Sequence, residues 1–296
     1  PSYRVTRDEK HLTRGRANTL RLALSNQLDL KDKDSYSSSP LASDAIKEVM
    51  ELCVSCKACR RECPTGVDMA KMKIEFLSAY KKRVGHTMRD LAVAYLPKYA
   101  PIISAIPGLP ALLNLRNHLA PIAKLQEWVM GISAQRSLPI WKAKNFWSNQ
   151  SAIASYQFTP AELSNADTNR NKGVVLLADT FNSYFEDENL QAALTVLKAA
   201  GYRVHIPQKS LNKPNSGLDK IKNTCSKEFC CGRTYLAAGM VDKAKASLDE
   251  LVNHLAPFAE KDIPIIGLEP SCLFTLKDEA LVMGFGERAV TVSKQV

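Results

Sequence analysis

Four closely spaced cysteines constrain what this chain can fold into more than any other feature of its 296 residues. Cys53, Cys56, Cys59 and Cys63 follow the spacing C-x2-C-x2-C-x3-C, and Pro64 comes directly after the last of them. This spacing is typical of 4Fe-4S cluster loops, because three thiolates in one short loop can reach three corners of a cubane. A zinc site or a set of plain thiols is the alternative, but structural zinc sites usually place two C-x2-C pairs well apart. The pattern therefore predicts that these four cysteines ligate a 4Fe-4S cluster.

The chain contains only one such motif, which bears on where the remaining cluster ligands lie. In proteins with two of these clusters, the fourth cysteine of each motif ligates the other cluster. On that rule, the other three ligands of the cluster bound by Cys63 are absent from the chain. The cluster on Cys53, Cys56 and Cys59 likewise lacks its fourth ligand. The chain opens with Pro1, so a cysteine immediately before it would complete a second Cys-Pro pair. We therefore expect a second motif just upstream and regard the sequence as part of a longer one.

Helical patterns surround the motif. Residues 3–28 read as a helix, because leucines and alanines lie among many arginines. Ser43 or Asp44 can cap a helix that runs into the motif. Its buried side is formed by four apolar residues: Ile46, Val49, Met50 and Leu52. A further amphipathic helix is expected from Asp68 to about residue 82. We predict an α-helical 4Fe-4S domain of the ferredoxin type over residues 1–90.

Residues 91–172 are expected to form a connecting region. The stretch LAVAYLPKYAPIISAIPGLPALLNL nearly reaches the ~20 apolar residues of a membrane helix. Four prolines interrupt it, and each interior proline costs a helix ~3 kcal/mol. Three tryptophans follow among lysines and arginines, up to residue 147. We expect short helices packed on the rest of the protein, with a patch that rests on a membrane surface or a partner as the alternative. Residues 148–172 read as a polar linker.

The pattern changes again at residue 173. Buried strands are predicted at three places: 174–179, 202–207 and 264–269. Helices are predicted between and after them: 188–201, 232–260 with a break near Gly239, and one starting at Pro270. This alternation indicates a mainly parallel α/β domain over residues 173–296. The predicted fold is therefore multidomain, with an α-helical ferredoxin-like domain followed by an α/β domain.

A second group of cysteines lies in this α/β region. Cys230 and Cys231 stand just before Gly232, and Cys272 follows the third predicted strand. Both segments are expected at the carboxyl ends of strands, where sites form in parallel sheets. Adjacent cysteines are poor disulfide partners, so the pair suggests metal binding or redox chemistry. The alternative is that both are simply small buried residues in a tight turn. Cys225 stands in a polar loop and is expected to be incidental.

Composition narrows the classes of function. The net charge of +10 suits an acidic partner, an anionic membrane or a nucleic acid, without choosing among them. Aromatic residues, 7% of the chain, are not interleaved with a basic stripe, so we expect no nucleic-acid partner. No GxGxxG, Walker-type or GxSxG motif is present, and we assign no catalytic residue. Clustered thiols without an export signal indicate a reducing, cytoplasmic location, and peripheral contact at the inner face of the membrane stays open.

Several segments together resemble a known family. They are PSYRVTRDEKHLTRGRANTLR, CVSCKACRRECPTGVDMAKMK, ADTFNSYF, CCGRTYLAAGMVDKAK and LEPSC. They are similar to the C-terminal iron–sulfur region of large bacterial FAD-linked oxidases, the D-2-hydroxy-acid dehydrogenases of the D-lactate and D-2-hydroxyglutarate type. The iron–sulfur subunit of glycolate oxidase and the B subunit of heterodisulfide reductase are more distant relatives through a cysteine-rich CCG domain.

The resemblance implies a role and partners. It implies FAD on a flavin domain before Pro1 that takes a hydride from a 2-hydroxy acid, and a second CCG domain after Val296. Electrons would leave through the clusters to a quinone, a cytochrome or a soluble carrier. The alternative function is a heterodisulfide-reductase-like thiol–disulfide oxidoreductase acting at the CCG domain.

The sequence departs from the fuller CCG pattern in two places. Asp179 and Thr180 stand where that pattern has an early cysteine, and Cys272 stands without a second cysteine three residues from it. Cys230, Cys231 and Cys272 could still hold a metal, with Asp179 as a further ligand. A noncubane cluster at this position is therefore left open.

Overall fold

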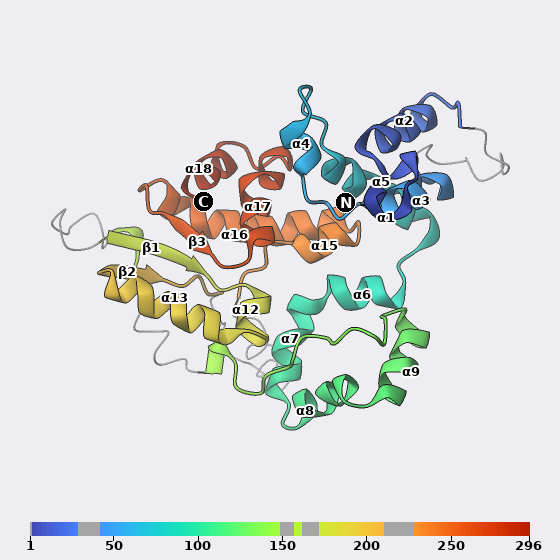
Figure 1. Cartoon of the computed structure of the whole chain (residues 1–296). Helices are drawn as coiled ribbons and strands as arrows, with labels where there is room; N and C mark the ends of the chain where they lie inside the picture. The colour runs from blue at the N-terminus through green and yellow to red at the C-terminus, as the bar shows by residue number, and fades with distance from the viewer. Residues whose placement is uncertain (1, 29–41, 149–156, 162–171, 210–227) are drawn as a thin grey trace. The chain divides into compact units, whose positions relative to one another are not determined.

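The structure is a computed structural model that describes residues 2–28, 42–148, 157–161, 172–209 and 228–296. The described chain divides into two compact units (Figure 1). The first unit comprises Pro1–Asp90 and Tyr235–Val241, and the second comprises Leu91–Thr234 and Asp242–Val296. The domain boundaries predicted from sequence remain predictions. Cys225 lies outside the described residues.

Short helices build the first unit. They are α1 (Ser2–Thr6), the 3-10 helix η1 (Glu9–His11), α2 (Thr13–Leu24), α3 (Asp44–Glu51), α4 (Ala58–Glu62), α5 (Met69–Val84) and the start of α6 (Met88–Ala94). Their apolar faces meet in one core, which we call the helical core: Leu20, Ala23, Ile46, Met50, Met69, Phe76 and Tyr80. The predicted cap at Ser43 is confirmed, because its hydroxyl accepts from the Ile46 amide. The helix predicted from Asp68 also forms, and Asp68 caps it by accepting from the amides of Ala70 and Lys71.

Two details of the helical prediction are wrong. Residues 3–28 do not form one helix, because Arg7 has a φ of +56° and Asp8 caps a separate 3-10 turn. Leu52 is also not buried with the rest of its helix face. Its side chain is 43% exposed, since α3 ends at Glu51 and the chain turns toward the cysteines.

A three-stranded parallel sheet organises the second unit (Figure 1). Its strands are β1 (Lys172–Leu177), β2 (Tyr202–His205) and β3 (Ile265–Gly267), in the order β2-β1-β3. The register places Val174 beside Val204 and Val175 beside Ile265. The prediction of a parallel sheet built from these three segments is confirmed, although β1 begins and ends two residues earlier than expected and β2 and β3 are shorter.

The sheet has a core on each face, because alternate residues of a strand point to opposite sides. Val175 and Leu177 pack into one core with residues of α16 (Val241–Ala259), α17 (Pro270–Lys277) and α18 (Glu287–Gln295). Val174 and Leu176 pack into the other with α13 (Asp187–Ala199) and with Phe146 and Trp147. The shorter elements beside them are α12 (Thr180–Tyr184), α15 (Arg233–Ala237), η5 (Phe146–Ser148) and η6 (Glu279–Val282).

The predicted break in the helix after Gly232 is confirmed. The chain forms α15 and then α16, and Gly239 stands between them with a φ of +75°. A Cβ on Gly239 would lie 2.7 Å from the backbone of Leu77. A residue with a side chain would be strained there both by its φ and by this approach.

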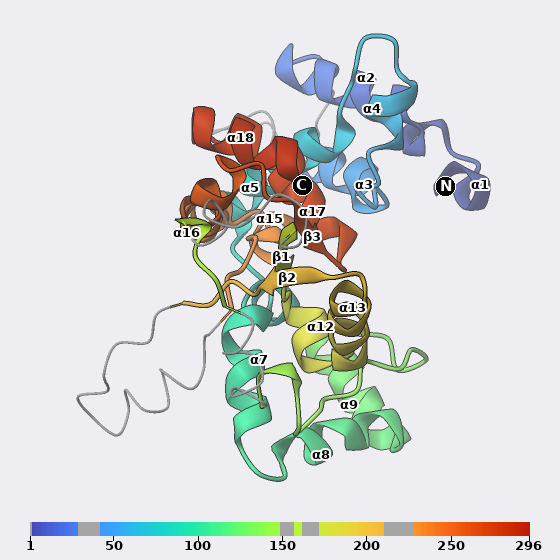
Figure 2. The same ribbon diagram turned by 90° about the vertical axis from the view of Figure 1, so that its left-hand side faces the viewer.

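Short helices also form between residues 91 and 148, as predicted. They are α7 (Leu96–Ala105), α8 (Leu109–Asn114), the 3-10 helix η4 (Leu115–Asn117) and α9 (Ala120–Met130). In both views α8 and α9 lie at the end of the second unit away from α16, α17 and α18 (Figures 1 and 2). Within the described ranges, no helix combines the length and the apolar character that crossing a bilayer requires.

Candidate functional site

The four-cysteine motif, residues 53–63, forms a loop that ends in the short helix α4, and we call this whole segment the thiol loop. The Cys53 amide donates to the carbonyl oxygen of Met50 at 3.0 Å, so the loop leaves directly from the last turn of α3. Ser55 and Lys57 then adopt left-handed conformations with φ of +54° and +60°. Such residues reverse the chain direction over a few positions, which keeps the thiols within one short loop.

The four thiols sit in different surroundings. Cys53 and Cys59 pack against the helical core, whereas Cys56 is exposed. Cys63 is half-buried, and its sulfur lies 3.1 Å from the Thr65 hydroxyl. This hydrogen bond, with backbone amides as further donors, lowers the pKa of Cys63. The loop therefore has an apolar inner side and an open outer side.

Cationic side chains approach the loop from the helices behind it. The Lys73 ammonium, on α5, donates to the carbonyl oxygen of Cys53, and burial lowers the pKa of Lys73. The buried Arg16 guanidinium, on α2, donates to the carbonyl oxygen of Val49 at 3.1 Å. Positive charge near the loop would favour thiolates and an anionic ligand.

The residue types of the thiol loop fit an iron–sulfur cluster, but the side chains do not enclose a metal as they stand. All four cysteines are free thiols, the donor that iron in such clusters prefers. In the part of the chain that the structure describes, no three His, Cys, Asp or Glu side chains gather so that they could hold a metal ion. The assignment of Cys53, Cys56, Cys59 and Cys63 as ligands therefore remains a prediction.

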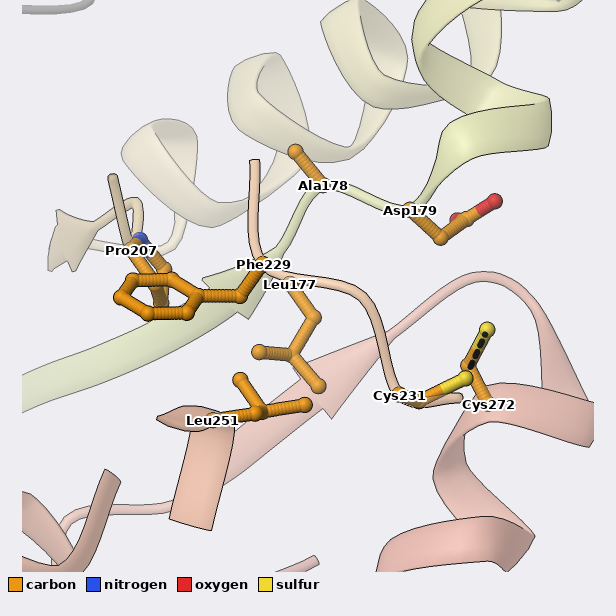
Figure 3. Close-up of a pocket in the computed structure, with 8 residues that line it drawn as sticks. All are labelled: Leu177, Ala178, Asp179, Pro207, Phe229, Cys231, Leu251 and Cys272. Atoms are coloured by element: carbon orange, nitrogen blue, oxygen red, sulfur yellow. Dashed lines mark hydrogen bonds between the residues drawn. The ribbon is translucent and has the colours of Figure 1, made fainter. Parts of the chain in front are cut away.

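The second cysteine group lies where the parallel sheet ends (Figure 3). Cys231 precedes α15, and Cys272 lies in the first turn of α17, directly after β3. The Cys231 thiol donates to the Cys272 sulfur, with 3.1 Å between the two sulfur atoms. Cys230 is not part of this contact, and its sulfur accepts from the Gly232 amide at 3.3 Å. The structure thus brings together Cys231 and Cys272, two thiols that are 41 positions apart in the sequence.

Close backbone packing fixes the position of the pair. Gly232 has a φ of +78°, and a Cβ there would lie 2.7 Å from the carbonyl oxygen of Ala244 on α16. Only glycine accepts both conditions without strain. On the other side, Glu269 caps α17 by accepting from the Ser271 amide at 3.1 Å.

Burial keeps the thiols beside Gly232 neutral. The hydrogen bond with Cys231 and desolvation raise the pKa of Cys230 well above its usual value. The hydrogen bond with Cys230 lowers the pKa of Cys231, but the hydrogen bond to Cys272 and desolvation outweigh it and raise that pKa as well. Both are therefore protonated thiols near neutral pH, and neither is a ready metal ligand.

The space around the pair is too small for a cluster. Two cavities adjoin it, with volumes of about 20 and 30 Å3. Each has room for a water molecule or two. Asp179, which lines both cavities, has its carboxylate engaged elsewhere: it accepts from the amides of Phe181 and Asn182 and from the Asn182 side chain. As the structure stands, Cys230, Cys231, Cys272 and Asp179 do not fit a metal or a noncubane cluster.

A buried acid near these thiols was missed from the sequence. The Glu228 side chain accepts from the Thr180 hydroxyl at 3.0 Å and from the Trp147 indole at 3.1 Å. Burial raises the pKa of Glu228 to about 8, so it is mostly protonated at neutral pH. Its donors lie 48 and 81 residues away, and nothing in the local pattern distinguishes this glutamate from a surface one.

A histidine pair was also missed, because the sequence scatters its members. His205 on β2 and His254 on α16 place their Nε2 atoms 3.4 Å apart, and their rings stack. Desolvation lowers the pKa of His205 to about 4 and also lowers that of His254. The pair is therefore neutral near pH 7 and packs among the aromatic rings of Phe158 and Phe258.

Comparison with known proteins finds relatives that share the same name, D-2-hydroxyglutarate dehydrogenase. No family model matches the chain, and no solved structure matches it. The chain is 23% identical to D-2-hydroxyglutarate dehydrogenase of Escherichia coli over 80% of its length, and 23% identical to the Pantoea ananatis and Pseudomonas putida proteins of that name over 94%. It spans 21% of the Escherichia coli protein and 28% of each of the other two. The chain is thus similar to about a quarter of the length of these dehydrogenases.

Proposed function

We propose that this chain is the iron–sulfur electron-transfer portion of an FAD-linked D-2-hydroxy-acid dehydrogenase. The cysteine spacing of the thiol loop is the observation that carries the proposal. The relatives support the class of enzyme, because they are named dehydrogenases of a D-2-hydroxy acid. FAD and the site of hydride transfer would lie on a flavin domain outside the chain.

In this proposal the thiol loop holds the cluster. Cys53, Cys56 and Cys59 supply thiolates, and Cys63 supplies a fourth to the same or a neighbouring cluster. A bound cluster supplies one-electron transfer between the flavin and an acceptor such as a quinone, a cytochrome or a soluble carrier. The helical core shields the inner thiols from water, and Lys73 and Arg16 offset negative charge. The exposed side at Cys56 gives a partner close access.

Metal content tests this proposal. We expect about four iron and four sulfide per chain after anaerobic reconstitution, with an EPR signal from the reduced cluster. Cys53→Ser and Cys59→Ser should each lose most of the iron, whereas Cys272→Ser should keep it. A three-iron cluster in the wild type would indicate that a ligand from outside the chain completes the site. Tight zinc with no iron would contradict the proposal.

The same proposal includes a surface that contacts a partner. We assign this surface to the segment from α8 to α9. Among the described residues, 13 of the 25 exposed large apolar side chains lie between Leu91 and Ile140. Helix α9 is held by polar contacts, since the buried Arg116 guanidinium donates to Gln126 at 2.7 Å. Its apolar side chains therefore face outward, and we call the following set the apolar face: Leu112, Leu115, Leu119, Ile122, Leu125, Trp128 and Val129.

The charges beside this face favour an anionic membrane surface as its partner. Residues 91–148 contain six lysines and arginines and a single acidic residue, Glu127. Of the six cations, Arg116 is buried and Lys142 pairs with two acidic residues of α13, which leaves four. Outward leucines and an indole, with cations nearby, are the features of helices that lie in a membrane interface. Trp128 is 83% exposed, which suits insertion at the level of the lipid headgroups.

Vesicle binding tests this surface independently of the cluster. The chain should sediment with phosphatidylglycerol-containing vesicles more strongly than with phosphatidylcholine vesicles, and Trp128 fluorescence should shift to the blue. Leu125→Glu with Trp128→Glu should abolish the binding, whereas Val196→Glu on α13 changes an equally exposed residue and should not. Equal sedimentation of all three proteins, or self-association in place of binding, would contradict a lipid partner.

One observation favours the second function, a thiol–disulfide oxidoreductase. Cys231 and Cys272 place their sulfur atoms 3.1 Å apart in a half-buried site. That function predicts reduction of a small disulfide substrate in the absence of flavin, with activity lost in Cys231→Ser. The electron-transfer function instead depends on flavin. It predicts that this chain oxidises no 2-hydroxy acid unless a flavoprotein is added.

A further inference from the structure

The contact between Cys231 and Cys272 has the features of a thiol pair that can close into a disulfide. The residues are 41 positions apart, on separate elements, yet their sulfur atoms lie 3.1 Å from each other. A disulfide bond is about 2.05 Å long, so closure requires the sulfurs to approach by only about 1 Å. Figure 3 shows the two side chains pointing toward one another across the end of the sheet.

The surroundings suit a thiol pair better than a metal. Cys231 belongs to the core between the sheet and α16, and Cys272 packs against the same core. Among described residues no third ligand joins them, and the adjoining cavities of about 20 and 30 Å3 leave no room for a cluster. A disulfide needs no additional volume, because it replaces two contacting thiols.

We propose that Cys231 and Cys272 form a reversible dithiol–disulfide centre that exchanges two electrons with a low-molecular-weight disulfide. This centre would serve the second function above, but its formation requires neither that activity nor an iron–sulfur cluster.

The reaction is balanced by ordinary thiol–disulfide exchange. The Cys272 sulfur, the more accessible of the two, attacks one sulfur of the incoming disulfide, loses its proton and releases one small thiol. The Cys231 sulfur then attacks Cys272, gives up its proton and releases the second small thiol. Two protein thiols are oxidised to one disulfide, and one small disulfide is reduced to two thiols.

Cys230 provides a matched control. It is adjacent to Cys231 in sequence and hydrogen-bonded to it, but its sulfur accepts from the Gly232 amide, whereas the sulfur that meets Cys272 belongs to Cys231. A disulfide between sequence neighbours requires a strained ring. The geometry therefore assigns the bond to Cys231, and the neighbouring thiol should remain reduced.

Peptide mapping of the intact chain tests the assignment. The reduced protein is equilibrated with glutathione and glutathione disulfide at several ratios, free thiols are blocked, and trypsin is added. Trypsin releases EFCCGR, residues 228–233, and DIPIIGLEPSCLFTLK, residues 262–277. We expect these peptides to be joined under oxidising conditions, with the joined fraction falling as reduced glutathione rises. The Cys230→Ser protein should give the same titration.

Three outcomes would overturn the proposal. The wild-type peptides could remain separate at every ratio while circular dichroism shows a folded chain. The Cys231→Ser protein could link the two peptides as fully as the wild type, which would assign the bond to Cys230. The wild-type protein could bind iron that the Cys231→Ser and Cys272→Ser proteins specifically fail to bind. None of these outcomes depends on the iron content of the thiol loop, which Cys53→Ser and Cys59→Ser measure separately.

Discussion

The two cysteine groups of this protein contrast in every physical respect. The thiol loop in the first unit has an exposed side, left-handed residues and cations nearby. Cys231 in the second unit is 6% exposed and lies at the end of a sheet, in contact with the Cys272 thiol. An exposed loop can adjust around a bulky anionic group, whereas a half-buried pair beside small cavities is restricted to chemistry that needs no extra volume. The same residue type is thus suited to metal in one place and to disulfide exchange in the other.

Buried titratable groups extend the contrast. The second unit encloses Glu228 and the pair of His205 and His254, all in the neutral form near pH 7. In the first unit, by contrast, the ion pair between Lys10 and Glu48 is partly exposed to solvent. The second unit should therefore respond to pH on both sides of neutrality.

Thiol alkylation should separate the two groups most strongly. In the reduced metal-free protein, Cys56 should react with iodoacetamide at least ~100-fold faster than Cys231, because thiolate fraction and access both decide the rate. Residue-resolved mass spectrometry measures both rates in one sample, and urea-unfolded protein is the control in which they should converge. Comparable rates in the folded protein would contradict the burial described for Cys231.

A pair of glycine substitutions compares the backbones of the two groups. Gly232→Ala should lower the free energy of unfolding by roughly 3 kcal/mol, because its φ is +78° and its Cβ would meet the backbone of Ala244. Gly66→Ala, beside the thiol loop, should cost about 1 kcal/mol, since its φ is +67° but nothing lies within 4 Å. Chemical denaturation followed by circular dichroism measures both. Equal losses would show that the close approach at Gly232 is relaxed.

Glu228→Gln tests the buried acid at high pH. A carboxyl group whose pKa is raised from 4.5 to about 8 in the folded state favours folding below pH 4.5, and this contribution is lost as pH rises through 8. Relative to the wild type, the variant should gain roughly 3 to 4 kcal/mol in unfolding free energy between pH 5 and pH 8.5. All three tryptophans lie in the second unit, so their fluorescence follows its unfolding. A difference independent of pH would contradict a protonated Glu228.

His205→Phe tests the low-pH side and should have the smallest effect. A histidine whose pKa is lowered from 6.5 to about 4 leaves stability intact above pH 6.5 and reduces it as pH falls toward 4. Between pH 7.5 and 5.5 the wild type should lose about 1 kcal/mol more than the variant. The exposed His118→Phe serves as the control and should leave the pH dependence unchanged. Identical pH dependence in all three proteins would rule out a titrating pair.

Local sequence patterns determined much of the fold. Three apolar runs predicted the parallel strands, and Ser43 and Asp68 predicted helix starts, because strand burial and capping depend on residues near one another in the chain. The break at Gly239 was predicted for the same reason. The prediction of one long helix over residues 3–28 was wrong. The left-handed Arg7 and the Asp8 cap end one helix before the next begins, and neither feature shows in the hydrophobic pattern.

Only the tertiary structure decided which distant residues meet. The sequence predicted the four cysteines of the thiol loop as ligands by spacing alone, since all lie within eleven residues. It also placed Cys231 and Cys272 at one edge of a sheet. It could not show that their sulfurs touch, that the Asp179 carboxylate caps α12, or that Glu228 and His205 are buried. Those properties depend on how α16 and α17 pack against the sheet, and packing joins residues that no local pattern relates.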